Sequence, residues 1–250
     1  MVGLTGLGDE LFVLRNRDAD QVEVYSTKTS EDFAQLRQFS VKDLGKHISN
    51  DMTSCARRRC LYISDWKNWC VLKSALNGDV TAKWRVPYSP DGLSVTPSSS
   101  VLVTCCDGRR LLELCSDSGE CVRQVELQSD IVRPWHAIQL ASQHYVVSHG
   151  DKELSGVCMV DGDGQVLASY EGPYRSDVTQ LYWPCHVTTD LDNSVFVADY
   201  ENRRIVLLGP GLELKSHIEI QQWPYRLHLD QVTRRLYVGH LEGEIHVMQV

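Results

Sequence analysis

The sequence lacks the features that mark several large classes of protein. None of its 250 residues belongs to an apolar run approaching the roughly 18 consecutive residues that a membrane helix needs. The start of the chain, from Met1 to Asp9, has neither the basic segment nor the apolar run of a secretion signal. No window keeps an apolar helical period for long enough to need a helix. These absences predict a soluble, cytoplasmic protein without membrane contact.

Cysteine pairs with metal-ligand spacing are also missing. The nine cysteines include no C-x-x-C pair, and no Cys/His cluster has the short spacing of a structural zinc site. Their odd number and scattered positions favour reduced thiols buried in strands, as in a reducing compartment. One disulfide between Cys55 and Cys60, across a short turn, remains an alternative.

An excess of positive charge is absent as well. The chain has 33 acidic residues against 25 Lys and Arg, for a net charge of −8. Proteins that bind nucleic acid by releasing counterions are usually basic, so the charge argues against DNA and against non-specific RNA binding. A local basic patch could still exist on an acidic protein.

What the sequence does contain is a repeat. A short β-rich apolar run followed by a polar turn recurs six times, starting at Leu11, Leu61, Val101, Tyr145, Val195 and Leu236. A spacing of about 40 to 50 residues suits one four-stranded propeller blade. Further strand-like runs flank each copy, and turns containing Gly or Asp separate them, which is the hairpin signal.

The sequence therefore predicts an all-β fold, one six-bladed β-propeller of four-stranded antiparallel blades spanning residues 1–250. The blades are expected at about 1–41, 42–86, 87–129, 130–172, 173–220 and 221–250. The last segment ends after its third strand. Either the sixth blade has only three strands, or the chain is a fragment of a longer protein. A monomeric propeller is expected.

The fifth blade carries the most specific pattern. Pro184 and Asp190 bracket its first strand, and the next run reads Val197-Ala198-Asp199, then Asn202, Arg204 and Ile205. This pattern resembles the NHL repeat, with His186 in place of the usual glycine. Looser matches occur at Pro90–Val95, at Pro134-Trp135-His136 and at Ile63-Ser64-Asp65.

The resemblance implies a function in binding. NHL propellers are best known as the C-terminal domains of tripartite-motif (TRIM) proteins, where they bind partner proteins or single-stranded RNA. A RING zinc domain carries the ubiquitin-ligase activity of those proteins, and its ladder of Cys and His residues is absent here. The resemblance thus implies the substrate-reading part of a ubiquitin ligase, which cannot transfer ubiquitin alone.

Two enzymatic alternatives come from related propellers. In peptidyl-amidoglycolate lyase, three histidines that each follow the proline of the repeat hold a zinc ion. The matching positions here contain no histidine: Val2, Asp51, Asp91, Trp135, Cys185 and Tyr225. His136 and His186 lie one residue further on, which predicts that they point to the other side of their strands. We expect no catalytic residue, no metal site and no cofactor.

A calcium-dependent lactonase or esterase is the second enzymatic alternative. Asp51 and Asp91 could begin a calcium site, because calcium prefers oxygen ligands. A third acidic or Asn residue at an equivalent position is lacking. Both aspartates are therefore expected to hydrogen-bond their own loops.

One end of the central channel is the candidate binding site. Residues just before each inner strand, and the loops between second and third strands, should gather there. The candidate partner-binding residues are Trp66, Asp91, Trp135, His136, His186, Tyr200, Arg203, Tyr225 and Arg226. Aromatic side chains beside Arg and His anchor peptides well, and they also suit stacking of unpaired bases. The structural alternative is packing between blades.

The sequence favours a non-enzymatic platform for a protein or peptide partner over this face. Sequence-specific binding of single-stranded RNA by the same face, for post-transcriptional regulation, is the alternative. The lactonase-like enzyme is the third hypothesis.

Overall fold

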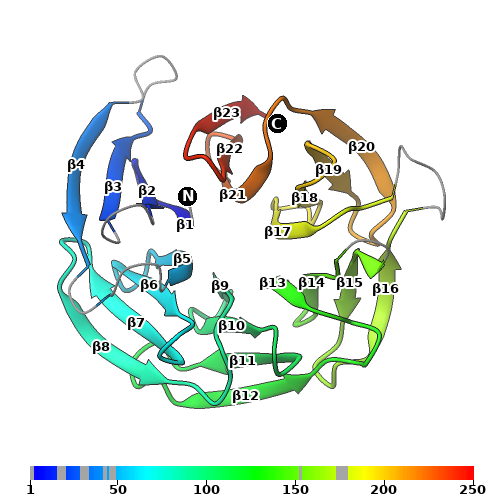
Figure 1. The fold of residues 1–250 in the computed structure, drawn as a ribbon, viewed down its shortest axis with the longest axis horizontal. Coiled ribbons are helices and arrows are strands. Elements are labelled where there is room, and N and C mark those ends of the chain that lie inside the picture. Colours follow the sequence, from blue (N-terminus) through cyan, green and yellow to red (C-terminus); the bar gives the residue numbers. More distant parts are fainter. Residues whose placement is uncertain are drawn as a thin grey trace.

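The computed structural model describes residues 3–15, 21–28, 34–41, 44, 49–151, 154–172 and 180–250. Its strands form six antiparallel sheets around a central axis (Figure 1). The first three blades contain β1 (Gly3–Leu7), β2 (Glu10–Arg15), β3 (Gln21–Ser26) and β4 (Gln35–Ser40); β5 (Ser49–Cys55), β6 (Cys60–Asp65), β7 (Cys70–Ala75) and β8 (Val80–Arg85); and β9 (Gly92–Val95), β10 (Val101–Cys105), β11 (Arg110–Leu114) and β12 (Cys121–Glu126). The last three contain β13 (Pro134–Gln139), β14 (Tyr145–His149), β15 (Gly156–Val160) and β16 (Val166–Tyr170); β17 (Pro184–Thr189), β18 (Val195–Asp199), β19 (Arg204–Leu208) and β20 (Leu214–Glu219); and β21 (Pro224–Asp230), β22 (Arg235–His240) and β23 (Ile245–Gln249).

Each blade is a meander in which consecutive strands pair. The inner strands nearest the axis are β1, β5, β9, β13, β17 and β21 (Figure 1). Five sheets have four strands and the sixth has three, β21 to β23. The predicted all-β, six-bladed propeller with a three-stranded last blade is confirmed.

Burial falls from the second strand of a blade to its outermost strand. Every residue of β6, β10, β14 and β18 is buried, since these strands are paired along both edges and covered on both faces by neighbouring blades. Every residue of β20 is exposed. Complete burial of one large aliphatic side chain contributes about 1.5–3 kcal/mol, so the second strands dominate the stability of each blade.

Apolar clusters between neighbouring blades hold the ring together. Between the second and third blades, Tyr62 and Trp84 pack against Val101 and Val103. The ring centroids of Tyr62 and Trp84 lie 5.5 Å apart. The repeating apolar runs of the sequence are therefore interfaces between blades as well as strands.

The ring closes between the sixth and first blades by the same means. Leu11 and Val13 of β2 pack with Tyr237 of β22. Arg235 adds a hydrogen bond from Nη1 to the backbone oxygen of Thr27, 3.1 Å away. Side-chain packing thus joins the two ends, with the sixth sheet remaining a sheet of three strands.

The residues that match the NHL pattern form a buried polar network in the fifth blade. The Asp199 carboxylate accepts hydrogen bonds from Arg204 Nε at 2.6 Å, from Asn202 Nδ2 at 2.8 Å and from the backbone N–H of Tyr182 at 2.7 Å. Arg204 and Asn202 also donate to the backbone oxygen of Gln180. The pattern therefore fixes the β18–β19 turn to the segment that enters the blade, which is a structural role.

All nine cysteines are free. Cys55 and Cys60 face each other across β5 and β6, as the sequence suggested, but both remain thiols.

Among the residues that the structure describes, no helix has the length and apolar character needed to cross a membrane.

Candidate functional site

Bulges at the start of the inner strands decide which side chains face the channel. In β13 the pairing passes from Pro134 opposite His149 to His136 opposite Ser148, so Trp135 is an inserted residue. The same irregularity occurs in β17 and β21 and at the start of β5. A bulge adds one residue to its strand and re-aims the side chains around it.

With these bulges in β5, β13, β17 and β21, each of the six inner strands has one residue at the same level of the channel. In every blade, this residue of the inner strand lies beside the last residue but one of the second strand. We call this set the inner ring: Gly3, Asp51, Gly92, His136, His186 and Arg226. The two glycines allow neighbouring inner strands to approach closely, since a Cβ on Gly92 would lie 2.5 Å from the backbone oxygen of Trp135 and one on Gly3 would lie 2.6 Å from Cβ of Met52. Four polar side chains therefore share the centre of the propeller.

The prediction that His136 and His186 point to the other side of their strands is wrong. It counted residues from the proline and did not include the bulge. The two rings stack with centroids 3.7 Å apart and an interplanar angle of 21°. One ligand atom from each of Asp51, His136 and His186 lies within 4.8 Å of the others.

Asp51 hydrogen-bonds the backbone next to it, as the sequence predicts, and it also bonds to two other blades, which the sequence did not predict. Its Oδ1 accepts from the backbone N–H of Met52 at 2.9 Å and from Arg226 Nε at 3.1 Å. Its Oδ2 accepts from the backbone N–H of Leu93, in the third blade, at 2.9 Å. Asp51 is 1% exposed, so this carboxylate is a buried junction of the second, third and sixth blades.

Arg226 crosses the channel to reach that carboxylate. Besides its contact with Asp51, it donates from Nη2 to the backbone oxygen of Asn50 at 2.6 Å and from Nη1 to that of Tyr225 at 3.0 Å. Its guanidinium carbon lies 4.2 Å from the centroid of the Tyr225 ring. Arg226 is 6% exposed. This arginine therefore lies inside the protein, below the surface that a macromolecular partner would touch.

Burial favours the neutral form of the two ring histidines. It lowers the pKa of His136, although the nearby Asp51 carboxylate acts in the opposite direction. It lowers the pKa of His186 well below the usual value, and the positive charge of Arg226 adds to the effect. His136 Nε2 lies 3.1 Å from the backbone oxygen of Leu93, which assigns the proton to that nitrogen. Among the described residues, Nδ1 of each histidine is buried and has no hydrogen-bond partner.

Aromatic side chains form a continuous row at the channel mouth, the end where the inner strands begin. Ring centroids are 5.7 Å apart for Trp135 and Trp183, 5.2 Å for Trp183 and Tyr200, 6.0 Å for Tyr200 and Tyr225, and 6.5 Å for Tyr200 and Trp223. We call these five residues the aromatic row. All five are partly exposed. The row extends over the fourth, fifth and sixth blades.

Two exposed arginines lie at the ends of this row. The guanidinium of Arg133 lies 5.2 Å from the centroid of Trp135, and that of Arg203 lies 4.9 Å from the centroid of Trp223. Arg133 also pairs with Asp151 at 2.7 Å. Cation–π contacts of this kind stabilise exposed rings by about 0.5–1 kcal/mol.

The candidate residues from the sequence separate into three groups. Trp135, Tyr200, Tyr225 and Arg203 meet at the mouth, within or beside the aromatic row. His136, His186 and Arg226 are buried in the inner ring beneath it. Asp91 lines a pit beside the row, and Trp66 lies elsewhere on the same end. Trp66 occupies the β6–β7 turn and is 38% exposed, with the Lys67 ammonium 5.6 Å from its ring.

Sequence reasoning missed Trp183, Trp223 and Arg133. Each of them directly precedes the proline that starts an inner strand. The repeated Trp-Pro pair at 183–184 and 223–224 was the available signal. The candidate residues of the channel mouth were chosen from the positions that follow these prolines, so the positions that precede them were left out.

A small pit opens between the rings of the aromatic row. Its volume is about 40 Å³, and its lining includes Trp135, Trp183, Tyr225 and Asp91. Asp91 accepts hydrogen bonds from the backbone N–H of Cys106 at 2.9 Å, within its own blade, and from Asn50 Nδ2 at 3.1 Å. Burial raises the pKa of Asp91 to about 6. The pit has room for about one water-sized group.

Below the inner ring, the channel widens into a cavity of about 320 Å³. Its lining includes both ring histidines, His228, and the hydroxyl side chains of Thr5 and Thr53. Burial lowers the pKa of His228 to about 4, so this imidazole is neutral at pH 7. The inner ring is thus bordered by the mouth on one side and by this cavity on the other.

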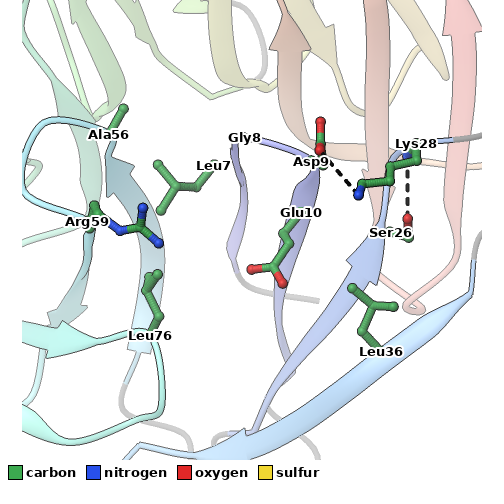
Figure 2. A pocket seen from close by; sticks show the side chains of 10 residues that line it. All are labelled: Leu7, Gly8, Asp9, Glu10, Ser26, Lys28, Leu36, Ala56, Arg59 and Leu76. Atoms are coloured by element: carbon green, nitrogen blue, oxygen red, sulfur yellow. Dashed lines mark hydrogen bonds and ion pairs between the residues drawn. The ribbon is translucent and has the colours of Figure 1, made fainter.

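A separate cleft of about 630 Å³ lies at the opposite end, between the first and second blades (Figure 2). Lys28 pairs with Asp9 at 3.7 Å and Glu10 pairs with Arg37, and the Arg59 guanidinium also lines the cleft. Leu7 and Leu76 contribute apolar surface.

No protein-family model matches the chain, and no curated protein matches it. Solved structures do. Hydrazine synthase from Kuenenia stuttgartiensis is similar at a TM-score of 0.70 and 12% identity, covering 100% of this chain and 95% of that one. Virginiamycin B lyase from Staphylococcus aureus has a TM-score of 0.67 and 11% identity, covering 100% and 84%. A Bacteroides caccae protein of unknown function has a TM-score of 0.70 and 14% identity, covering 93% and 83%. At these identities the similarity shows the propeller fold alone.

Proposed function

We propose that this propeller is a non-enzymatic platform that binds a protein or peptide partner over the aromatic row. The observation that carries the proposal is the row itself. Five aromatic rings from three consecutive blades contact one another at the channel mouth and still remain partly exposed. Tyr and Trp provide large contact area with little conformational freedom to lose, and they dominate the binding energy of many interfaces.

The pit within the row supports recognition of one protruding group. Among the described residues, Trp183 Nε1 is buried and has no hydrogen-bond partner. A carbonyl or hydroxyl of a bound peptide could accept from it. The Asp91 carboxylate lies at the same pit and is mostly ionised at pH 7. The combination favours a small polar group of the partner, held between aromatic side chains.

Single-stranded RNA is the second candidate. Exposed Arg133 and Arg203 beside aromatic rings suit phosphates and stacked bases. Two observations oppose it: Arg133 already pairs with Asp151, and the chain carries a net charge of −8. The two ligands differ in their response to salt, since RNA affinity falls steeply as salt rises and apolar peptide contacts change little.

The resemblance to NHL domains supports a role as the substrate-reading part of a TRIM-like protein. Nine free cysteines support a reducing, intracellular location. A calcium-dependent enzyme gains little support from the channel, because the inner ring offers imidazole nitrogens and Asp51 is already paired with Arg226.

The test is selection from a random peptide library displayed on phage, followed by affinity measurement of the enriched peptides. Tyr200→Ala removes the ring that contacts three others in the row. We expect it to weaken the enriched peptides by more than about 10-fold, as loss of a binding hot spot does. Trp66→Ala is the matched control, because Trp66 is an exposed aromatic residue at the same end and outside the row.

Equal affinity of native protein and Tyr200→Ala for the enriched peptides would refute the proposed site. A parallel selection from a random single-stranded RNA pool at near-physiological salt tests the second candidate. Enrichment of an RNA motif that depends on Tyr200, without peptide enrichment, would establish RNA as the ligand instead.

A further inference from the structure

The inner ring contains a cluster of metal-ligating groups that partner binding at the mouth does not use. One ligand atom from each of Asp51, His136 and His186 lies within 4.8 Å of the others. The three residues come from the second, fourth and fifth blades. They are 1%, 2% and 6% exposed, so the cluster is part of the interior.

Two ring nitrogens in this cluster lack a partner. Nδ1 of His136 and Nδ1 of His186 are buried, and no described residue hydrogen-bonds to either. A buried polar atom left unpaired is costly, and native proteins usually supply a partner. Water or a cation could provide it, and the adjoining cavity of about 320 Å³ gives access to both histidines.

The surroundings resemble those of a metal ligand in two further respects. His136 already donates from Nε2 to the backbone oxygen of Leu93, and such an outer contact orients a histidine for metal binding through its other nitrogen. Burial also disfavours the charged imidazolium in both histidines, and only neutral imidazole binds metal.

We propose that Asp51, His136 and His186 bind one divalent transition-metal ion of the Zn²⁺ or Co²⁺ class. Two imidazole nitrogens and one carboxylate oxygen suit these ions, and a further position would remain open towards the channel cavity. Bonds of about 2.0–2.2 Å place tetrahedral ligands about 3.4 Å apart, so ligand atoms up to 4.8 Å apart must approach by up to about 1.4 Å. The stacked imidazole rings must also turn, because an imidazole binds a metal in the plane of its ring. The adjoining cavity of about 320 Å³, which both histidines line, gives the rings room for such a change.

Arg226 lowers the affinity that this site can have for a metal ion. It holds Oδ1 of Asp51 at 3.1 Å, whereas Oδ2 accepts one hydrogen bond, from the backbone N–H of Leu93, and keeps a second lone pair for the metal. Because the guanidinium charge lies beside the metal position, binding is weaker than in a structural zinc site. Ca²⁺ and Mg²⁺ do not bind, since they need more oxygen ligands than the ring supplies. The proposal is independent of what binds at the mouth.

The experiment titrates the chelator-treated chain with Co²⁺ alone and with Zn²⁺ alone. Calorimetry measures stoichiometry and affinity, and the visible absorption of Co²⁺ reports its ligands. We expect one ion per chain and no binding of Ca²⁺. His186→Phe keeps a stacked ring and removes the ligand nitrogens, so it should weaken binding by more than about 30-fold. His217→Phe is the matched control, since His217 lies on the outer strand β20 and should leave binding unchanged.

Zn²⁺ bound to the native chain is also measured by X-ray absorption, which does not depend on whether a variant folds. Nitrogen and oxygen neighbours without sulfur support the site. Sulfur ligands from the free cysteines would overturn it, as would unchanged affinity in His186→Phe or failure of the native chain to bind either ion.

Discussion

Removal of the Arg226 guanidinium should destabilise the propeller more than removal of any surface charge. Asp51 is 1% exposed, and Arg226 is the cation that pairs with it across the channel at 3.1 Å. Arg226→Met keeps most of the side-chain volume but leaves a buried carboxylate without its counter-charge. Breaking a buried ion pair from one side costs about 3–5 kcal/mol. A single domain is stable by about 5–15 kcal/mol, so the variant still folds but has lost much of its reserve.

The assay is urea unfolding followed by tryptophan fluorescence, for which the chain has six tryptophans. Arg133→Met is the matched control, because Arg133 and Asp151 form an ion pair of similar length with side chains 55% and 44% exposed. Exposed pairs contribute about 0–1 kcal/mol, so this control should lose less than that. Asp51→Asn combined with Arg226→Met should be less destabilised than the sum of the two single variants, because no buried charge is left alone.

Two outcomes would refute this reasoning. One is a loss of less than about 1 kcal/mol in Arg226→Met, within the range of an exposed pair. The other is additive behaviour of the two substitutions, which would mean that Asp51 and Arg226 do not stabilise each other. Because loss of Arg226 alone disturbs the fold, a substitution of Arg226 is unsuitable as a test of partner binding.

Two further predictions concern pH and packing. Between pH 6.5 and about 4, the free energy of unfolding should fall on acidification, because burial lowers the folded-state pKa of His149 and of His228 to about 4 and the unfolded chain therefore binds more protons. Burial raises the pKa of Asp91 to about 6, which has the opposite effect on stability, but this is one group against two histidines. Urea unfolding across this pH range measures the net change in the free energy of unfolding. Greater stability on acidification would contradict the prediction. Gly92→Ala should destabilise by at least about 1–3 kcal/mol, because its Cβ would lie 2.5 Å from the backbone of the neighbouring inner strand. Gly8→Ala is the control in thermal melts, since only its positive φ of 59° opposes the substitution and its Cβ would meet nothing within 4 Å; equal melting temperatures would refute the packing argument.

The architecture could be predicted from the sequence because it repeats. Six apolar runs at regular spacing each need two covered faces, and a closed ring of blades provides them. The count of strands in the last copy gave the three-stranded blade correctly. Even the Asp199 network is local, since Asn202 and Arg204 lie three and five residues further along the chain.

The centre of the propeller was not predictable in the same way. Alternation along a strand assigns His136 and His186 to the wrong side, and one inserted residue in each strand reverses that assignment. Counting along the sequence aligns Asp51 of the second blade with Trp135 of the fourth blade. In the structure, Asp51 lies at the same level of the channel as His136. No local pattern reveals such a bulge, because it depends on how the inner strand pairs with its neighbour.

The sequence by itself thus determined the fold class, the repeat and the gathering of aromatic residues at one end of the channel. Periodicity and turn residues carry that information over short distances in the chain. Only the tertiary structure decided that Arg226 and Asp51, 175 positions apart, pair across the axis, and that two histidines stack beside them. Such contacts depend on closure of the ring, which brings residues of different blades to one point.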